Sequence, residues 1–458
     1  MKTPSKVAVI DIGKTNAKVV VLDVEKGVEV ARSQVSNLVL KTAPYPHYDT
    51  DMLWSFFVHS LKSFARDPGY EAISITAHGA SAALLDERGN LALPVLDYEF
   101  EFPRGLVEAY TAIRPPFFET LSPLLPAGLN LGAQIHFQKS TLPREFARVR
   151  TILMYPQYWA FRLSGVLASE VTSLGCHTDL WLPEKKSYSK LVDRLGIRSL
   201  MAPIFSAFDE LGPLKKSIAE NLGLTRSIPV FCGIHDSNAS LLPHLMSMAP
   251  PFTVVSSGTW TVNFAIGGDV QHLDPRRDSL ANVDAYGNAV ASSRFMGGRE
   301  FQHLEKELGQ FDQAAAFETL PNVIKKQVML LPSVIAGCGP FPEKVGRWLN
   351  SDPSRKPERW CAACLYLALM TESCLDLIGA KGQILVEGPF ASNWIYLTAL
   401  ASFTGREVAS LADASTGTSF GAALLANAQP AIADRTIFRP GEIEGLQPYR
   451  TAWKHAAE

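Results

Sequence analysis

The chain has 458 residues, 47% of them hydrophobic, and a formal net charge of −2. This length exceeds what one hydrophobic core usually holds, so we expect at least two domains. The balanced charge gives no reason to expect nucleic acid or a membrane surface as a partner, and the sequence shows neither an apolar signal segment nor a run long enough to span a bilayer.

The first expected elements are two strands joined as a β-hairpin. A β-branched apolar run from Val7 reaches Asp11, breaks at Gly13-Lys14-Thr15-Asn16 and resumes at Lys18, which is typical of a hairpin. The turn can direct backbone N–H groups and the Thr15 hydroxyl at a phosphate, while Asp11 faces a hydrated Mg²⁺. An ordinary hairpin is an equally good interpretation of this stretch, because neither a Walker A sequence nor Gly-x-Gly-x-x-Gly is present.

A helix and then a strand with a polar loop follow. Asp49 or Thr50 can cap a helix that buries Leu53 and further apolar residues at helical spacing. Ala72–Gly79 is expected to be a strand that runs into a loop. Polar residues in such loops are candidate ligands for hydroxyl groups, so His78 is either a ligand or a hydrogen-bonded histidine without a catalytic role.

An aspartate at a strand end is expected near the middle of the chain. A strand ends at Cys232-Gly233, and Asp236 begins a helix of small residues. The carboxylate therefore lies at a helix N-terminus, where negative charge is favoured and the group stays ionised. An isolated aspartate in this place is usually only an N-cap.

A second hairpin repeats the first one. Phe252–Ala265 again has a strand, a turn of small polar residues that contains Ser257-Gly258-Thr259, and a second strand. One such hairpin near the start of each half of the chain indicates a duplicated domain.

Two glycine-containing loops are expected in the second half. Gly297-Gly298 should form a loop before a helix over Glu300–Leu308, where the absence of side chains permits a close approach of the backbone. A strand over Gln383–Glu387 should lead into a loop over Gly388–Asn393. A helix of small residues is expected over Thr418–Ala426.

The six cysteines are expected to be free thiols, because a chain of this length without an export signal rarely carries a disulfide framework. Cys361 and Cys364 form a Cys-x-x-Cys pair in the helix-like segment Trp360–Met370. A metal or redox role is the less favoured interpretation, since no second Cys or His pair lies at zinc-ligand spacing. We expect these thiols on a buried helix face and the protein in the cytoplasm.

The two hairpin turns and the segment Gly233-Ile234-His235-Asp236, in this order, resemble the FGGY carbohydrate kinases of the sugar kinase, Hsp70 and actin superfamily. The resemblance runs from about Val7 to Asn427. It implies an α/β protein with two RNase H-like (actin-like ATPase) domains, each a mixed β-sheet flanked by helices, with a cleft between them. It also implies that residues 1–248 hold the sugar site and the catalytic base and residues 249–458 the nucleotide site.

The resemblance further implies roles for single residues, with ATP and Mg²⁺ as cofactors. Asp236 matches the aspartate of the family's Gly-x-x-Asp motif, which takes the proton from the sugar hydroxyl, and Asp11 and Asp236 match the positions near the metal. The residues expected to hold ATP or its phosphates are Gly13, Lys14, Thr15, Asn16, Ser257, Gly258, Thr259, Gly298, Gly388, Pro389 and Asn393. Those expected to contact the sugar are His78, Gly79, Tyr98, Glu99, His235 and Asp236.

Three segments depart from the family pattern. His78 stands where the family usually has Gln, Tyr98-Glu99-Phe100-Glu101 replaces Trp-x-Asp, and Glu387-Gly388 replaces Gly-Gly. The first two changes fall in loops that line the sugar pocket of the family, so they put its usual substrates in doubt more than its chemistry. The third change leaves the nucleotide preference open. For Lys14, a contribution to phosphate binding and a solvated turn lysine are both open interpretations.

The predicted function is ATP-dependent phosphorylation of a small sugar, with a ketopentose, ketohexose or ketotetrose of the rhamnulose, fuculose or xylulose type as the expected acceptor. The open alternative is a sugar- or nucleotide-binding regulator, or an ATPase, of the same superfamily. A nicotinamide-dependent oxidoreductase is disfavoured, because no Rossmann glycine loop follows the first strand. The sequence leaves the oligomeric state open, with a homodimer as one interpretation.

Overall fold

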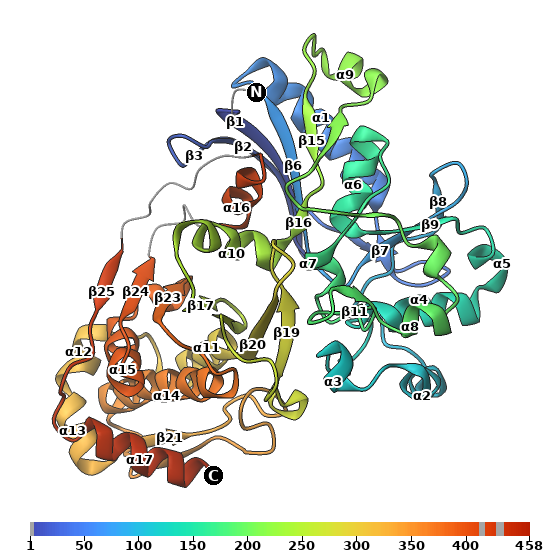
Figure 1. The fold of residues 1–458 in the computed structure, drawn as a ribbon. Coiled ribbons are helices and arrows are strands. Elements are labelled where there is room, and N and C mark those ends of the chain that lie inside the picture. Colours follow the sequence, from blue (N-terminus) through green and yellow to red (C-terminus); the bar gives the residue numbers. More distant parts are fainter. Residues whose placement is uncertain (1–3, 412–416, 427–434) are drawn as a thin grey trace. The chain divides into compact units, whose positions relative to one another are not determined.

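The computed structural model describes residues 4–411, 417–426 and 435–458 of the chain. The chain folds into two compact units, and each contains its own mixed β-sheet. The described residues of the first unit lie within 1–247, 281–289 and 415–432, and those of the second unit within 248–280, 290–414 and 433–458. Figure 1 labels the helices and strands of both units.

The main sheet of the first unit combines an antiparallel meander with parallel strands. Its order is β14-β15-β6-β1-β2-β3, and β16 also pairs with β6. β1, β2 and β3 are antiparallel neighbours, whereas β6 runs parallel to β1, β15 and β16. The strands are β1 (Lys6–Ile12), β2 (Asn16–Asp23), β3 (Val28–Ser36), β6 (Ala72–Ala77), β14 (Glu210–Pro213), β15 (Pro229–Phe231) and β16 (Ile234–His235).

The first strand is buried on both faces of its sheet, as its continuous apolar run requires. Ala8 and Ile10 of β1 lie in a core cluster with residues of α1 (Thr50–Arg66) and α6 (Tyr155–Ser164). Val7 and Val9 lie in a second cluster with residues of α10 (Asp236–Ser247) and α16 (Thr418–Leu424). Alternate side chains of one strand therefore hold a helical layer on each face of the sheet.

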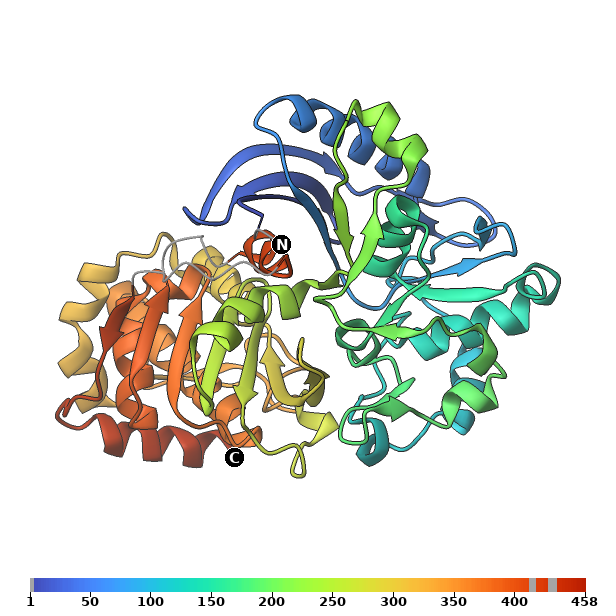
Figure 2. The same ribbon diagram turned by 45° about the horizontal axis from the view of Figure 1, so that its top comes forward.

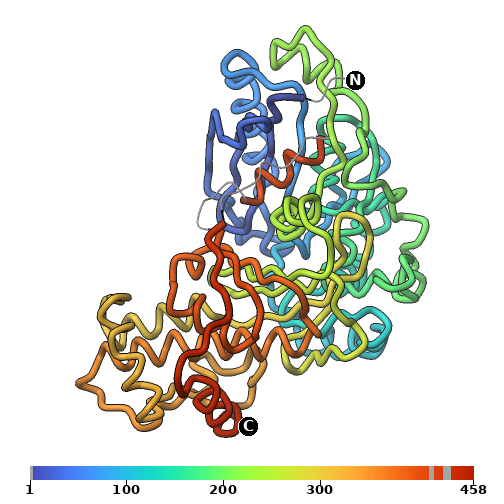
Figure 3. The backbone as a smooth tube through the Cα atoms, turned by 60° about the vertical axis from the view of Figure 1, so that its left-hand side comes forward, coloured from blue at the N-terminus to red at the C-terminus, as the bar shows by residue number. Residues whose placement is uncertain are grey.

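Helix α16 returns to the first unit from the C-terminal part of the chain. Figure 3 shows this red segment among the blue and green segments of the first unit, beside α10. A Cβ added at Gly421 would lie 1.7 Å from the carbonyl oxygen of Ala239. Glycine is therefore required here, because it lets the two helices approach closely.

The main sheet of the second unit repeats this plan. Its order is β19-β20-β18-β17-β23-β24-β25; β17, β18 and β20 form an antiparallel meander, and β23 pairs with β17 in parallel. The green, yellow, orange and red strands of this sheet lie side by side in Figure 2. Its strands are β17 (Phe252–Ser257), β18 (Thr261–Ile266), β19 (Ser279–Val283), β20 (Ala289–Phe295), β23 (Gln383–Glu387), β24 (Val408–Leu411) and β25 (Thr436–Phe438). The shared order of strands confirms the predicted duplication.

Helix α14 (Lys356–Leu377) forms the core of the second unit. It is long and apolar enough to cross a membrane by length and composition, yet 89% of its apolar window is buried inside the fold. Cys361 and Cys364 on this helix are fully buried, and none of the six cysteines, which all lie within the described residues, forms a disulfide. Burial raises the pKa of Cys364 to about 12, so this thiol is not reactive at neutral pH. The predicted buried helix face is confirmed.

Shorter elements complete the two units. In the first unit these are β4 (Val39–Leu40), β5 (His47–Tyr48), β7 (Ala82–Leu85), β8 (Leu91–Leu93), β9 (Thr151–Met154), β10 (Ser169–Glu170), β11 (Trp181–Leu182), β12 (Ser187–Tyr188), β13 (Ile204–Phe205), α2 (Arg104–Ile113), α3 (Phe117–Thr120), α4 (Leu131–Thr141), α5 (Pro143–Phe146), α7 (Val171–Leu174), α8 (Leu191–Arg194), η1 (Arg198–Leu200) and α9 (Lys216–Leu222). In the second unit they are η2 (Pro275–Arg277), α11 (Gly297–Leu308), α12 (Gln313–Glu318), α13 (Leu320–Lys326), β21 (Met329–Leu331), β22 (Arg347–Leu349), η3 (Pro389–Ser392), α15 (Trp394–Thr404) and α17 (Leu446–Ala457).

Two helix starts were predicted with different success. Asp49 caps α1 and accepts a hydrogen bond from the backbone N–H of Met52, as predicted. The loop predicted at Gly297-Gly298 is wrong, because α11 already begins at Gly297. Glycine has no side chain to mark the first turn of a helix, so the apolar pattern that located this helix starts too late.

Candidate active site

Three strand ends of the first sheet lie at the same edge. The register pairs Ala77 of β6 with both Ile12 of β1 and His235 of β16. Because these strands are parallel, the residues that follow their carboxyl ends emerge at one edge of the sheet, which is where ligands bind in open α/β sheets. The residues brought there are Gly13, His78 and Asp236.

Asp11 is buried at the end of β1 and is held by two donors. Its Oδ2 atom accepts a hydrogen bond from the hydroxyl of Ser419 at 2.6 Å and lies 3.1 Å from Nζ of Lys18. Lys18 is its cross-strand partner in the hairpin, and Ser419 comes from α16. The orientation of this carboxylate therefore depends on the hairpin and on the returning helix.

Asp236 opens α10, and its side chain is 31% exposed. Its Oδ1 atom accepts a hydrogen bond from the backbone N–H of Ser237 at 2.6 Å and lies 3.3 Å from Nε2 of His235. Burial raises the pKa of Asp236 to about 6; among smaller influences, His78 lowers it and the charge of Asp11 raises it. The carboxylate is therefore ionised at neutral pH, and its pKa is close to the value that suits a general base.

Two buried side chains hold the segment that leads to Asp236. Nε2 of Gln157 donates hydrogen bonds to the carbonyl oxygens of Cys232 and Gly233, each at 3.1 Å. The backbone N–H of His235 donates to the hydroxyl of Thr172 at 3.0 Å. These bonds fix the backbone on which the carboxylate stands, which is a condition for precise placement of a reacting group.

The two histidines of the site are neutral. Burial lowers the pKa of His235 to about 4 and lowers the pKa of His78 as well. Nδ1 of His78 donates to the carbonyl oxygen of Gly79 at 2.9 Å, so Nε2 carries the free lone pair. Nε2 is buried and has no hydrogen-bond partner within the described residues. A buried acceptor of this kind suits the hydroxyl of a ligand.

Gly79 lies against His235, because a Cβ added at Gly79 would be 2.7 Å from Nε2 of that histidine. The rings of Tyr48 and Tyr98 lie on His78, with centroids 5.1 Å and 5.4 Å away. The predicted sugar-contacting residues of the first unit therefore form one group, and aromatic rings make up part of its wall.

Lys14 is not a solvated lysine. Its side chain is 20% exposed, and Nζ bonds to Oδ1 of Asp97 and lies 3.4 Å from Oε2 of Glu99. Nζ also lies 4.6 Å from the centre of the Tyr98 ring. Its turn neighbours Thr15 and Asn16 are exposed. The solvated interpretation is thus wrong, and the predicted phosphate contact of Lys14 stays a prediction.

In the second unit, the turn of the second hairpin packs against two glycines. A Cβ added at Gly298 would lie 1.9 Å from the carbonyl oxygen of Gly258, and a Cβ added at Gly388 would lie 1.9 Å from that of Ser257. The hydroxyl of Ser257 donates to the carbonyl oxygen of Glu387 at 2.5 Å. The structure thus brings together the predicted nucleotide residues Ser257, Gly258, Thr259, Gly298, Gly388 and Pro389.

Asn393 has a structural task in the same region. Its Oδ1 atom accepts a hydrogen bond from the backbone N–H of Tyr396 at 3.1 Å and caps α15, while Nδ2 lies 3.3 Å from Sγ of Cys364. The side chain is buried. A role of Asn393 in nucleotide binding stays a prediction.

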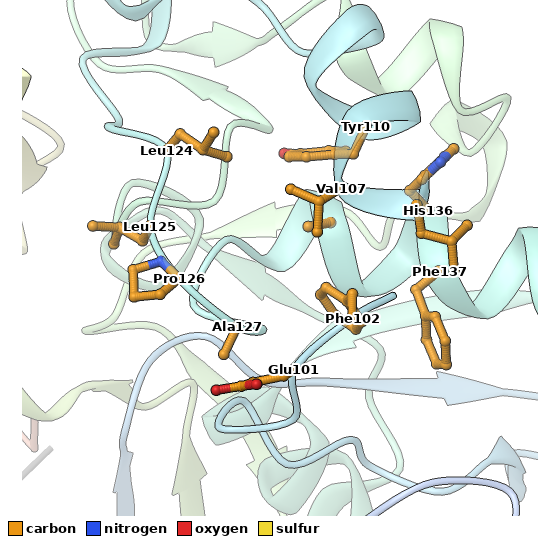
Figure 4. Close-up of a pocket in the computed structure, with 12 residues that line it drawn as sticks. Glu101, Phe102, Val107, Tyr110, Leu124, Leu125, Pro126, Ala127, His136 and Phe137 are labelled. Carbon is orange, nitrogen blue, oxygen red and sulfur yellow. The ribbon is translucent and has the colours of Figure 1, made fainter. Parts of the chain in front are cut away.

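A separate cavity of about 420 Å³ lies in the first unit between α2, α4 and residues 124–127. Figure 4 shows its mostly apolar walls, among them Phe102, Leu124 and Phe137, with Glu101 beside Ala127. Glu101 belongs to the loop Tyr98–Glu101 that was expected to line the sugar pocket, but none of the residues singled out as contacts of the sugar or the phosphates lines this cavity. It is therefore distinct from the site around Asp236.

Four residues of the site were not assigned this role from the sequence, although some signals exist. Lys18 follows from the register of the predicted hairpin, which places it opposite Asp11. Asp97 directly precedes the predicted Tyr98. Thr172 lies in a segment that resembles the family, but its hydrogen bond to His235 spans 63 positions. Ser419 contacts Asp11 across 408 positions, which no local pattern can reveal.

The charges of the first unit suit a divalent cation near Asp11. No group of three or more His, Cys, Asp or Glu that could hold a metal by itself occurs in the part of the chain that the structure describes. Asp11 nevertheless lies within electrostatic reach of Asp236, since its charge raises the pKa of Asp236. A cation with a hydration shell needs only one or two carboxylates when phosphate oxygens supply further ligands.

Two family models match the chain. The FGGY family of carbohydrate kinases, N-terminal domain, matches residues 7–243, and carbohydrate kinase FGGY, C-terminal domain, matches residues 249–434. The crystal structure of a carbohydrate kinase from Novosphingobium aromaticivorans is 36% identical, with a TM-score of 0.91 over 98% of this chain and 100% of that chain. The predicted fold of two α/β domains of the actin-like type is confirmed.

Curated relatives match over a shorter stretch. L-fuculokinase of Salmonella typhi is 25% identical over 272 residues, which are 58% of this chain and 57% of that protein. Probable L-xylulose kinase of Pasteurella multocida is 27% identical over 282 residues, or 58% of this chain and 56% of that protein. This chain thus spans little more than half the length of the curated relatives it matches.

Proposed function

Because this chain belongs to the FGGY family of carbohydrate kinases, we propose that it transfers the γ-phosphate of ATP to a hydroxyl group of a small neutral sugar. The observation that carries this proposal is the placement of Asp236 at the sheet edge where Asp11 and His78 also lie. Phosphoryl transfer asks for little more than placement, charge neutralisation and a carboxylate near the acceptor hydroxyl.

Asp236 serves as the general base in this proposal. Its ionised carboxylate accepts the proton of the sugar hydroxyl as that oxygen attacks the γ-phosphorus. Neutral His78 accepts a hydrogen bond at Nε2 from another hydroxyl of the sugar, while Tyr98 and His235 form walls of the site. The sugar is thereby oriented before the reaction, which lowers the entropic part of the barrier.

A neutral ketose is the proposed acceptor. Asp97 and Glu99 lie beside the ammonium group of Lys14. Together with Asp236, they provide three carboxylates that act electrostatically on Tyr98. This excess of negative charge disfavours a sugar acid. The names of the curated relatives, L-fuculokinase and L-xylulose kinase, support a ketose.

The phosphates of ATP are assigned to the two hairpin turns, Gly13–Asn16 and Ser257–Thr259, and the rest of the nucleotide to the loop at Gly388. Asp11 would hold hydrated Mg²⁺, which neutralises negative charge on the phosphates when bound. Lys18 and Ser419 keep the Asp11 carboxylate in one orientation for this task. In this proposal residues 1–248 bind the sugar and contribute the first phosphate turn and Asp11, and residues 249–458 bind the rest of the nucleotide.

The direct test is ADP release from Mg²⁺–ATP in the presence of a panel of ketotetroses, ketopentoses, ketohexoses, aldoses, polyols and aldonic acids. We expect one neutral ketose to raise turnover far above the rate with water alone, and the aldonic acids to give no increase. A flat response to the whole panel, with nucleotide still bound, would instead favour a non-catalytic regulator.

The pH dependence of the reaction should report Asp236. Its pKa of about 6 in the free protein predicts that kcat/KM for the sugar falls about 10-fold per pH unit below pH 6, because the protonated carboxyl accepts no proton. His235 is neutral above a pKa of about 4 and does not contribute to this limb. Initial rates between pH 4.5 and 8 would measure this decrease in kcat/KM. A flat profile down to pH 5 would contradict the role of Asp236 as the general base.

Replacing Gly298 with alanine should weaken ATP binding. The new Cβ would lie 1.9 Å from the carbonyl oxygen of Gly258, so the turn has to move. We expect the KM for ATP to rise about 10-fold, with about 1–3 kcal/mol lost in the free energy of unfolding from overpacking. Gly105→Ala, also in a helix but with open space around it, is the matched control. Equal ATP KM values for the two variants would remove Gly298 from the nucleotide site.

A further inference from the structure

Lys14 belongs to a turn that is assigned to phosphate, but its ammonium group lies elsewhere. Nζ bonds to Oδ1 of Asp97, lies 3.4 Å from Oε2 of Glu99 and lies 3.4 Å from the hydroxyl of Tyr48. It also lies over the ring of Tyr98, 4.6 Å from the centroid. Two carboxylates and two phenol groups thus surround one ammonium, which is a favourable set of partners for a cation of low exposure.

These contacts hold the loop that carries Tyr98. Oδ1 of Asp97 also accepts hydrogen bonds from the backbone N–H of Glu99 at 3.2 Å and from the hydroxyl of Tyr48 at 3.4 Å. Asp97 is buried, so its carboxylate depends on these donors for compensation. Among them Lys14 alone brings a positive charge. Without it, the loop keeps a buried carboxylate beside the exposed carboxylate of Glu99.

The loop in turn forms the wall opposite His78. The ring of Tyr98 meets the ring of His78 edge to face, and Tyr48 packs on the same imidazole. Nε2 of His78 is buried and has no hydrogen-bond partner among the described residues. The shape of the site around this atom therefore depends on the positions of Tyr98 and Tyr48. Lys14 contacts both tyrosines, and its charge also acts on His78.

We propose that Lys14 is a positioning residue for the sugar rather than a ligand of the ATP phosphates: through Asp97 and Tyr98 it sets the wall that faces His78. This inference rests on the proposed kinase function. It reassigns one residue of the turn, while Gly13, Thr15 and Asn16 keep their place in phosphate binding.

The test separates the two substrates kinetically. Lys14→Met keeps an unbranched apolar side chain and removes the charge, so we expect the KM for the sugar to rise about 10-fold, while the KM for ATP changes less than 2-fold and kcat changes little. Asp97→Asn should have the same signature. The double variant should be no worse than the more affected single variant, because both changes break one interaction.

Lys26→Met is the matched control. Lys26 also lies in a hairpin turn and pairs with an aspartate, Asp23, but its side chain is 75% exposed and neither residue of this pair is assigned to the site. The KM values of Lys26→Met for the sugar and for ATP should equal those of the wild-type protein. Thermal unfolding of all variants shows whether each is folded; a poorly folded Lys14→Met would be replaced by the Lys14→Met/Asp97→Asn pair, which leaves no unpaired buried charge.

Opposite results have distinct meanings. A rise in the KM for ATP with an unchanged KM for the sugar would overturn the inference and return Lys14 to the phosphate. Independent, additive effects of Lys14→Met and Asp97→Asn would also overturn it. If the wild-type protein turns over no sugar of the panel, the proposed function itself fails, and the inference falls with it.

Discussion

Replacing Asp236 with asparagine should lower kcat by about 10³-fold, within the roughly 10²–10⁴-fold range that general-base catalysis contributes. The amide accepts no proton, yet it keeps the size of the side chain and its place at the start of α10. Sugar binding and the free energy of unfolding should therefore change little. Single-turnover measurements with the best sugar of the panel, together with sugar titration by calorimetry, would separate the chemical step from binding.

Asp236→Asn has a useful companion in Ser237→Ala. Ser237 is the neighbour whose hydroxyl lies 3.2 Å from Oδ1 of Asp236, so its removal disturbs the carboxylate without removing it. We expect a decrease in kcat of less than about 10-fold, the size of one neutral hydrogen bond. Retained turnover in Asp236→Asn would assign the proton transfer to another group.

Replacing Arg114 with methionine should lower the free energy of unfolding by about 3–5 kcal/mol, the usual cost of breaking a buried ion pair from one side. Arg114 of the segment after α2 binds Asp179 through two hydrogen bonds, Nη2 to Oδ1 at 2.8 Å and Nε to Oδ2 at 3.0 Å. The side chain of Asp179 is 0% exposed, so the lost partner leaves a buried carboxylate. Urea unfolding followed by circular dichroism would measure the change.

Two further variants show whether charge or packing is responsible. Arg114→Met/Asp179→Asn removes both charges and should recover much of the lost stability, since the asparagine still accepts the hydrogen bond from Tyr110. Arg104→Met removes one partner of an exposed pair, with side chains 92% and 64% exposed, and should cost less than about 1 kcal/mol. Equal losses in the free energy of unfolding for Arg114→Met and Arg104→Met would mean that the buried ion pair contributes no more to stability than the exposed one.

The strand ends of the site were predictable from the sequence because local chemistry marks them. Asp11 and His78 each follow an apolar, β-branched run, and Asp236 follows a shorter one before a helix of small residues. Such runs predict strands, and the residues after parallel strands meet at one edge of a sheet. The pattern of the two hairpins was predictable for the same reason.

The partners of these residues were not predictable, because tertiary contacts decide them. From the sequence, Lys14 lies in a turn of polar residues, where a solvated lysine and a phosphate ligand are equally good interpretations. Only the positions of Asp97 and Tyr98 in the fold show which groups its ammonium contacts. The ionisation of Asp236 is a similar case. The helix N-terminus alone predicts a readily ionised carboxylate, whereas burial raises its pKa to about 6.

The return of α16 to the first unit has a consequence for how the protein forms during synthesis. Residues 4–247 lack the helix that covers Val7 and Val9 of β1 and the hydroxyl that bonds to Asp11. At about 5–20 residues per second, the intervening chain adds a delay on the order of ten seconds or more before Ser419 leaves the ribosome. Until then that face of the first sheet lacks the part of its cover that α16 provides beside α10, and the carboxylate assigned to the metal lacks one of its two anchors. The first unit to be started is therefore completed only after most of the second unit has been made.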